Sequence, residues 1–100
     1  MKFLLKRFDE LTQGELYRML QIRVEVFVVE QDCVYQDVDG KDLEGHHVLG
    51  YVNEAVEAYT RILPPGVSYD NYASIGRVLT TKKVRRNGFG RPLMRKTLKY

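Results

Sequence analysis

The residues with the clearest capacity for chemistry lie near the C-terminal end of the sequence, in the loop Arg85-Arg86-Asn87-Gly88-Phe89-Gly90. Its two glycines let the backbone come close to a ligand, so that successive N–H groups can converge on the ligand's oxygen atoms. Its adjacent arginines supply charge in a geometry suited to pyrophosphate. The loop is neither a P-loop nor a G-x-G-x-x-G dinucleotide loop, because neither spacing is present. The residue types therefore predict an anion site, although R-x-x-G-x-G alone occurs often by chance.

Two regular elements must position this loop. The stretch from Ser74 to Thr81 predicts a strand that enters it, and Gly90 to Tyr100 predicts a helix that leaves it. Pro92 would lie in the first turn of that helix, where its missing N–H costs least. The helix would add unpaired N–H groups and the positive end of its dipole to the site. A strand, a glycine turn and a helix in this order form a good anion site.

The charge distribution also indicates an anionic partner for this end of the chain. All 13 acids lie before residue 79 with 8 of the 16 Lys and Arg residues, so residues 1–78 carry −5 and residues 79–100 carry +8. Phosphate, nucleic acid or a lipid headgroup would each complement such a cationic end. A solvated helix face, offset by an acidic segment elsewhere, is the alternative reading of the same charges.

The rest of the chain predicts the scaffold. Residues 2–8 read as a first strand, and residues 12–30 as a helix that starts with the capping box Thr12-Gln13-Gly14-Glu15 and breaks or turns within Val26–Val29. Residues 31–45 read as an exposed acidic loop. Strands at 47–52 and 55–63 are joined by a hairpin turn at Asn53-Glu54, and Pro64-Pro65-Gly66 ends the second of them. The order β-α-β-β-β-loop-α predicts an α/β protein with mainly antiparallel early strands, not a doubly wound sheet.

Composition places the chain in one small domain of ordinary hydrophobicity. It has 100 residues, of which 44% are hydrophobic and 29% charged. No apolar run approaches the length of a membrane span or of a signal peptide's apolar region, and Cys33 is the only cysteine. We therefore expect a cytoplasmic protein without disulfides.

Several segments resemble one family, the ElaA-type group of the GCN5-related N-acetyltransferase (GNAT) superfamily. The stretch from Ile75 to Met94 looks like motif A of that superfamily, a strand followed by an R/Q-x-x-G-x-G/A loop and a helix. Residues 24–33, Val-Glu-Val-Phe-Val-Val-Glu-Gln-Asp-Cys, with Arg23 before them and Tyr35 after them, are similar to the group's "R-x-x-VFVVEQ-x-C-x-Y" signature. The acidic loop with His46-His47 and residues 58–66 follow in the same order. The resemblance covers almost the whole chain and is more specific than the glycine loop alone.

The resemblance implies both a fold and a reaction. The fold would be an acyl-CoA N-acyltransferase-like mixed, mostly antiparallel sheet flanked by helices. Residues 1–100 would form the N-terminal part of one such domain, without its C-terminal strands. The reaction would move an acetyl group from acetyl-CoA, as co-substrate and without a metal, to an amine of unknown identity. Because part of the cofactor cleft is missing, the alternative is a catalytically incomplete coenzyme A-binding or dimerisation module, and a homodimer could replace the missing surface.

The cofactor-binding residues implied by position form two sets. Strand backbone contacts to pantetheine would come from Leu79, Thr80 and Thr81, and pyrophosphate contacts from Arg85, Arg86, Asn87, Gly88, Phe89 and Gly90. Arg86 departs from the small residue common at its position, which would either crowd the turn or strengthen the anion contact.

The general base is less clearly indicated, because the motif-A strand contains no acid. Glu30 and His47 are the candidates for removing the amine proton. Each has a plain alternative, since Glu30 could be solvated at a helix end and His47 could be a structural hydrogen-bonding residue.

Other sites receive less support from the sequence. The acidic stretch Asp37-Val38-Asp39-Gly40-Lys41-Asp42 lacks the spacing of an EF-hand loop and reads as an acidic turn that could attract a cationic amine. The adjacent His46 and His47 would point to opposite faces of a strand and make a poor metal chelate. Nucleic-acid binding by the basic end is disfavoured, because few aromatic residues are interleaved with its cations.

Overall fold

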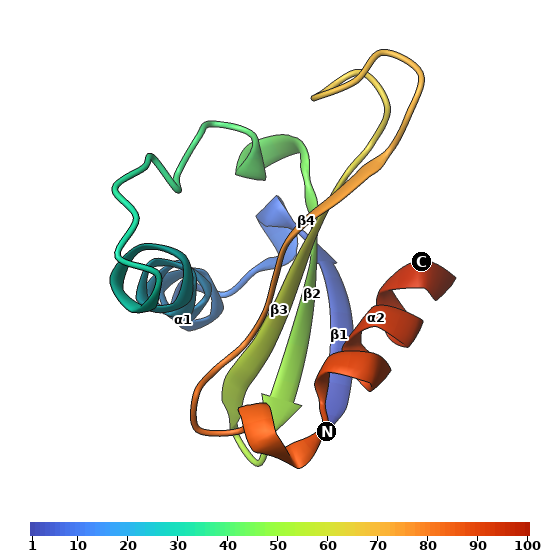
Figure 1. Cartoon of the computed structure of the whole chain (residues 1–100). Coiled ribbons are helices and arrows are strands. Elements are labelled where there is room, and N and C mark those ends of the chain that lie inside the picture. The colour runs from blue at the N-terminus through green and yellow to red at the C-terminus, as the bar shows by residue number, and fades with distance from the viewer.

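The computed structural model describes all residues from 1 to 100, and in it a four-stranded sheet lies between two helices (Figure 1). The regular elements are β1 (Lys2–Arg7), α1 (Gln13–Val24), β2 (His46–Val52), β3 (Ala55–Leu63), β4 (Ser74–Thr80) and α2 (Gly90–Lys99). A π-helix (Glu25–Glu30) continues α1, and single 3₁₀ turns lie at Phe8–Glu10, Asp42–Glu44 and Arg85–Asn87. The strand order is β1-β2-β3-β4, with every neighbouring pair antiparallel. The predicted α/β fold with antiparallel early strands is confirmed.

Helix α1 begins as its capping box predicts. The Thr12 hydroxyl accepts from the Glu15 N–H at 3.1 Å, and the Glu15 carboxylate accepts from the Thr12 N–H at 3.0 Å. Burial alone would raise the pKa of Glu15, but hydrogen bonds from Lys6, Thr12 and Tyr51 outweigh burial and lower that pKa to about 2. Glu15 thus fixes the start of α1 against both β1 and β2.

The predicted break in the first helix takes the form of the π-helix. The chain keeps its helical path to Glu30, but the hydrogen bonding widens over Glu25–Glu30. This stretch holds three β-branched residues, whose stiff side chains crowd an α-helix. The π-helix brings the end of the helical segment beside β4.

The two faces of the sheet bury separate apolar clusters, as a period of two residues requires. On the α1 face the cluster comprises Met19, Ile22, Val26, Leu49, Val56, Tyr59 and Leu79. On the α2 face, the fully buried Leu93 packs against Val48 and Ala58. The helices lie on opposite sides of the sheet in Figure 1. Each helix is therefore fixed to the sheet by its own core.

Strand β4 lies at the edge of the sheet and contains a bulge. Its register shifts between Tyr59 and Arg61 of β3, so that two β4 residues, Arg77 and Val78, oppose Thr60. Arg77 has a φ of 53°, which is uncommon for a residue other than glycine. The bulge bends β4 just before the three residues that lead to the glycine loop.

The connections follow the predicted turn chemistry. Asn53, with a φ of 58°, turns the chain from β2 into β3, as the hairpin prediction required. After Pro64 the chain leaves the sheet and forms the arm that projects at the top of Figure 1 before it returns as β4. Neither α1 nor α2 has the length and apolar composition of a membrane-spanning helix.

Candidate functional site

The predicted anion loop joins the end of β4 to the start of α2. A 3₁₀ turn covers Arg85–Asn87, Gly88 follows with a φ of 75°, and α2 begins at Gly90 without a side-chain cap. The N–H groups of Gly90 and Arg91 donate to no acceptor within the chain. Unpaired first-turn N–H groups and the helix dipole favour an anion at this position. The strand, loop and helix therefore have the geometry that the sequence predicted.

The fold itself does not require a glycine at position 90. A Cβ placed on Gly90 would meet no atom within 4 Å, and the residue has no positive φ. Gly88 differs, because its positive φ is strained for any other side chain. Open space over Gly90, beside free N–H groups, is what a ligand that approaches the backbone would need.

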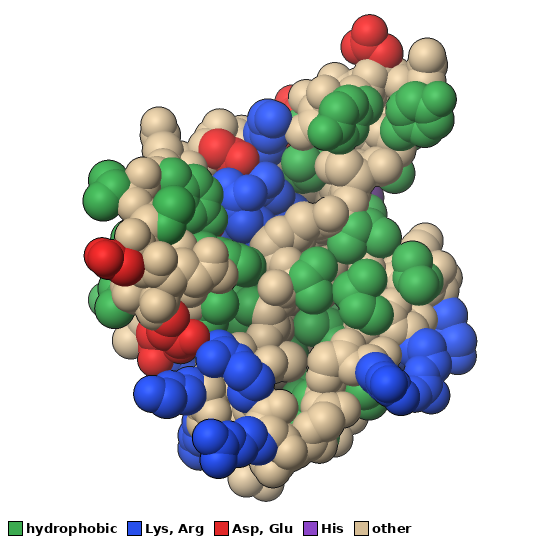
Figure 2. Space-filling view, in the orientation of Figure 1, with side chains coloured by type: hydrophobic (Ala, Val, Ile, Leu, Met, Phe, Trp, Pro, Cys, Tyr) green, Lys and Arg blue, Asp and Glu red, His purple; other side chains and the backbone are tan.

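Cationic side chains surround this loop. Lys82, Arg86 and Arg91 form no ion pair, while Lys83 lies 3.8 Å from Glu57. Lys and Arg side chains gather in the lower half of Figure 2, which in Figure 1 holds the loop and the start of α2. The sign of the local charge matches that of a pyrophosphate.

A pocket of about 400 Å³ adjoins the loop and separates the π-helix from β4. One wall is the π-helix and the other is the C-terminal half of β4. Its lining consists of Val26, Phe27, Glu30, Gln31, Val78, Leu79, Thr80 and Arg85. We call this pocket the edge cleft, because β4 presents its unpaired edge beside it.

The three predicted strand residues do not share one orientation. Thr81 faces β3, because its N–H donates to the Glu57 carbonyl at 2.8 Å and its hydroxyl donates to the Glu57 carboxylate at 3.2 Å. Leu79 is buried in the α1-side core. Thr80 lies between them, and since backbone groups alternate along a strand, its N–H and C=O face away from β3. Its carbonyl accepts from Arg85 Nη2 at 2.9 Å, which agrees with that orientation.

Glu30 lies in the edge cleft at the end of the π-helix, with its side chain 24% exposed. Its carboxylate accepts from Arg85 Nη2 at 2.9 Å. The same Arg85 nitrogen also binds the Thr80 carbonyl, so Arg85 spans the cleft from wall to wall. The structure thus brings Glu30, Thr80 and Arg85 together, although 55 residues separate Glu30 from Arg85.

His47 lies elsewhere, in the interior, and has no exposed surface. Its Nε2 lies 3.0 Å from the Asp42 carbonyl, which can only accept, so Nε2 carries the proton and Nδ1 accepts from the Tyr59 hydroxyl at 2.5 Å. Burial, and then the nearby charges of Arg23 and Arg61, lower the pKa of His47. The residue is buried, hydrogen-bonded at both ring nitrogens and absent from the cleft lining.

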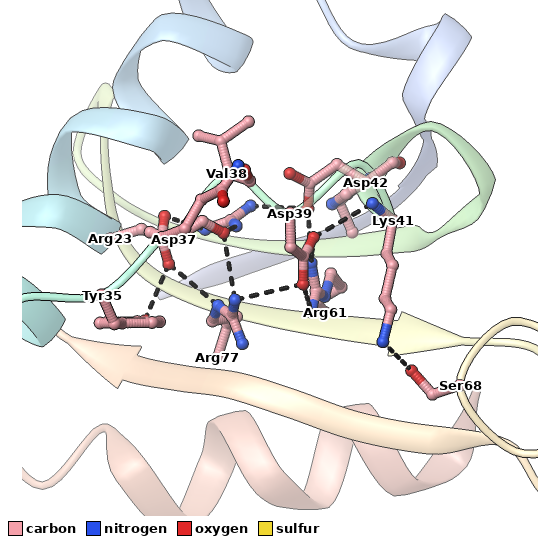
Figure 3. A network of polar contacts seen from close by, with 12 residues as sticks. Arg23, Tyr35, Asp37, Val38, Asp39, Lys41, Asp42, Arg61, Ser68 and Arg77 are labelled. Atoms are coloured by element: carbon pink, nitrogen blue, oxygen red, sulfur yellow. Dashed lines mark hydrogen bonds and ion pairs between the residues drawn. The ribbon is translucent and has the colours of Figure 1, made fainter.

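The acidic loop corrects one expectation. Most of the loop is exposed as predicted, yet Asp37 and Asp42 are only 4% and 5% exposed. Three arginines neutralise it, namely Arg23 from α1, Arg61 from β3 and Arg77 from β4 (Figure 3). The charges of Asp37, Asp39 and Asp42 are therefore used within the fold, whereas Asp32 and Glu44 at the two ends of the loop are exposed. No group of His, Cys, Asp and Glu side chains is arranged to hold a metal ion.

Two contacts of this region were not predicted from the sequence. The first is the span of Arg85 across the edge cleft, and the second is the binding of Arg23 and Arg77 to the same residue, Asp37. The available signal was that Arg77 is the only charged residue in β4. A lone charge in a strand of a small sheet needs a partner, and the acidic loop was the nearest source of one.

Comparison with known proteins gives the following relatives. The protein ElaA of Escherichia coli is 46% identical over 92 residues, which cover 90% of this chain and 60% of that protein. The crystal structure of an acyl-CoA N-acyltransferase from Pseudomonas aeruginosa superposes with a TM-score of 0.90 at 42% identity, covering 98% of this chain and 68% of that one. The crystal structure of Escherichia coli ElaA superposes with a TM-score of 0.88 at 40% identity, covering 99% and 67%. No protein-family model matches the chain. The chain spans about 60% of the length of the curated ElaA proteins that it matches.

Proposed function

We propose, on the premise that this chain belongs to the ElaA-type group of acyl-CoA N-acyltransferases in the GNAT superfamily, that it binds acetyl-CoA and moves the acetyl group to an amine. The observation that carries the proposal is the continuity of two features. Arg85 lines the edge cleft, which contains an outward-facing strand amide and a carboxylate, and the loop that starts at Arg85 leads directly to the free N–H groups at the start of α2. The first feature suits an acyl thioester and the second suits a pyrophosphate.

The residues of the chain fit such a ligand along its length. The pyrophosphate would lie at the backbone of residues 88–91 with Arg86 nearby, where open space covers Gly90. The pantetheine amides would lie along the β4 edge and accept from the Thr80 N–H, since a free strand edge offers unpaired backbone groups. A strand N–H directed at the thioester carbonyl would stabilise the negative charge that develops on its oxygen.

The proposed transfer is a direct one. The amine nitrogen forms a bond to the acyl carbon, the carbon–sulfur bond breaks, and coenzyme A leaves as a thiolate that takes up a proton from solvent. Glu30 takes the amine proton, because it lies in the edge cleft with part of its side chain exposed. We place Glu30 before His47 in this role, because His47 has no exposed surface and both of its ring nitrogens are already bonded.

The free edge of β4 favours a second candidate function, because it is where a further strand could add. On this view the chain binds coenzyme A without completing the transfer, or pairs with a second copy through that edge. Binding and turnover must therefore be measured separately.

Calorimetric titration with acetyl-CoA and with coenzyme A tests the binding step. Arg86→Gln removes one cation at the loop, whereas Lys99→Gln removes one at the far end of α2 and serves as the charge-matched control. Loss of a charge-assisted hydrogen bond costs about 1.5–3 kcal/mol, or roughly 10- to 100-fold in Kd, and is expected only for Arg86→Gln. Equal weakening by both variants would indicate unspecific attraction, and no heat with either ligand would refute the cofactor assignment.

Thiol release from acetyl-CoA, measured with a panel of amines, tests the transfer step. Glu30→Gln is expected to slow release by about 10²- to 10⁴-fold without weakening acetyl-CoA binding. Glu25→Gln, an exposed acid on the same π-helix without an ion pair, is the matched control. Binding without release by the unmodified chain would favour the second candidate function.

A further inference from the structure

The two walls of the edge cleft come from distant parts of the sequence. No backbone hydrogen bond joins the π-helix to β4. Arg23 lies in the last turn of α1, two residues before the π-helix begins, and Arg77 directly precedes the wall residues Val78–Thr80. Both walls therefore start from an arginine, and the position of each arginine fixes the direction of the wall that follows.

Asp37 binds both of these arginines through two kinds of oxygen. Its carboxylate accepts from Arg23 Nε and from Arg77 Nε, each at 2.9 Å, on opposite oxygens. Its main-chain carbonyl accepts from Arg23 Nη2 at 2.8 Å and from Arg77 Nη2 at 3.1 Å. Each guanidinium is held at two points, which fixes its plane as well as its distance. Figure 3 shows the two guanidinium groups converging on this one residue.

The surroundings leave Asp37 little freedom. Its side chain is 3% exposed and that of Arg23 has no exposed surface, so solvent screens these bonds weakly. The Tyr35 hydroxyl donates to the same carboxylate at 3.0 Å, and the Arg77 guanidinium lies 5.4 Å from the centre of the Tyr35 ring. The bridge is therefore a fixed part of the fold and not an exposed ion pair.

Arg77 itself needs this support. Its φ of 53° lies in the left-handed region, which costs roughly 1–2 kcal/mol for a residue other than glycine. Asp37 and Asp39 both bind its guanidinium and hold it in that conformation. Without them, the bulge could relax and β4 would follow a different path into Val78–Thr80.

We infer that Asp37 is a positioning residue that sets the width of the edge cleft by binding Arg23 and Arg77 at the starts of its two walls. The inference rests on the proposed function for its consequence in catalysis, but not for its geometry. Asp37 contacts neither wall surface and does not line the cleft. It acts through the two arginines alone.

The test measures the separation of the walls directly and without a ligand. Cys33, the single natural cysteine, is exposed just after the π-helix, and Lys82→Cys adds a second exposed label site just after β4. Spin labels at these sites report the distance distribution between the walls. Asp37→Asn is expected to broaden or shift that distribution, whereas Asp70→Asn, a change of an exposed acid in the projecting arm, leaves it unchanged. An unchanged distribution in Asp37→Asn overturns the inference, whether or not the chain binds coenzyme A.

A second variant covers the case in which Asp37→Asn does not fold. Arg77→Gly accepts the positive φ without strain and removes the bridge from one wall only, so the same broadening is expected in a folded chain.

In variants that fold and bind coenzyme A, a misplaced β4 edge should weaken acetyl-CoA binding about tenfold or more, since displacements near 1 Å can cost about 10²-fold in rate. A broadened distribution with unchanged affinity would support the role of Asp37 in setting the width and would overturn only its consequence for the ligand. If the unmodified chain itself shows no coenzyme A binding, the proposed function fails, while the label distances still decide the role of Asp37.

Discussion

Replacing Gly90 by alanine should make the protein more stable and a weaker binder of coenzyme A at the same time. Gly90 is the first residue of α2, has no positive φ, and a Cβ there would meet nothing within 4 Å. Alanine should therefore be accepted without strain, and it restricts the unfolded chain more than glycine does. The same Cβ would stand where the pyrophosphate is proposed to approach the backbone.

The magnitudes of the two effects can be set from the geometry. A strain-free glycine-to-alanine change at a helix start should add about 0.5 kcal/mol to the unfolding free energy, which for a domain of this size raises Tm by about 2–4 °C. Displacing the pyrophosphate from the helix N-terminus should weaken binding by about 10- to 100-fold in Kd. Gly88→Ala should lower stability by about 1 kcal/mol instead, because Gly88 has a φ of 75°.

Thermal unfolding and calorimetric titration on the same samples would test this pairing. Gly14→Ala is the matched control, since Gly14 also lies in the first turn of a helix, has open space for a Cβ, and is remote from the loop. It should show the same gain in Tm and no change in Kd. Coenzyme A affinity of Gly90→Ala within about twofold of the unmodified protein would refute the placement of the pyrophosphate.

Three further predictions concern stability. The carboxyl of Glu15 has its pKa lowered from 4.5 to about 2, so it should stabilise the fold fully above pH 4.5 and lose that effect as the pH falls toward 2. Between pH 4.5 and pH 2, the difference in unfolding free energy between the unmodified protein and Glu15→Gln should shrink by roughly 2–3 kcal/mol. Leu93→Ala, which empties the centre of the α2-side core, should cost about 2–5 kcal/mol in denaturant unfolding, against about 0.5 kcal/mol or less for the exposed Leu98→Ala. The pKa of His47 is lowered from 6.5, so the unfolded chain binds a proton more readily than the folded chain, and the unfolding free energy should fall as the pH drops below about 6.5. In His47→Gln this dependence of the unfolding free energy on pH should weaken. An unchanged pH dependence would mean that His47 is not the group responsible.

The strands and turns could be predicted from the sequence because their causes are local. Pro64 cannot continue the ladder of β3, and Asn53 accepts the positive φ that its turn needs. The capping box at Thr12 places the start of α1 at the residue where the structure has it. Each of these signals acts within a few residues, which is the range that a sequence pattern reports.

The burial of Asp37 and Asp42 within the otherwise exposed acidic loop was not predicted, because the partners of these two acids are remote. Asp37 binds Arg23, which is 14 residues away, and Arg77, which is 40 residues away. A run of acids and glycines is the same pattern whether water or arginine surrounds it. Only the sheet, which brings β4 beside the loop, decides between exposure and burial.

The parts of the candidate site likewise differ in whether the sequence predicts them. The glycine loop and the start of α2 are contiguous in sequence and could be predicted together. The edge cleft could not, because it depends on Glu30 and Arg85 meeting across 55 residues. Sequence spacing likewise did not separate Thr80, which faces outward, from Thr81, which binds Glu57.

The position of β1 in the sheet affects the order in which the chain can fold during its synthesis. β1 is made first, but its only neighbour is β2, which begins about 40 residues later. At about 5–20 residues per second, a ribosome needs roughly 2–8 s to make that stretch. Helix α1 forms within microseconds of leaving the exit tunnel, and β2, β3 and β4 can pair as each is completed, because their connections are short. The first strand to emerge thus waits longer for its partner than any other strand of the sheet, and Phe3 and Leu4 remain exposed for that interval.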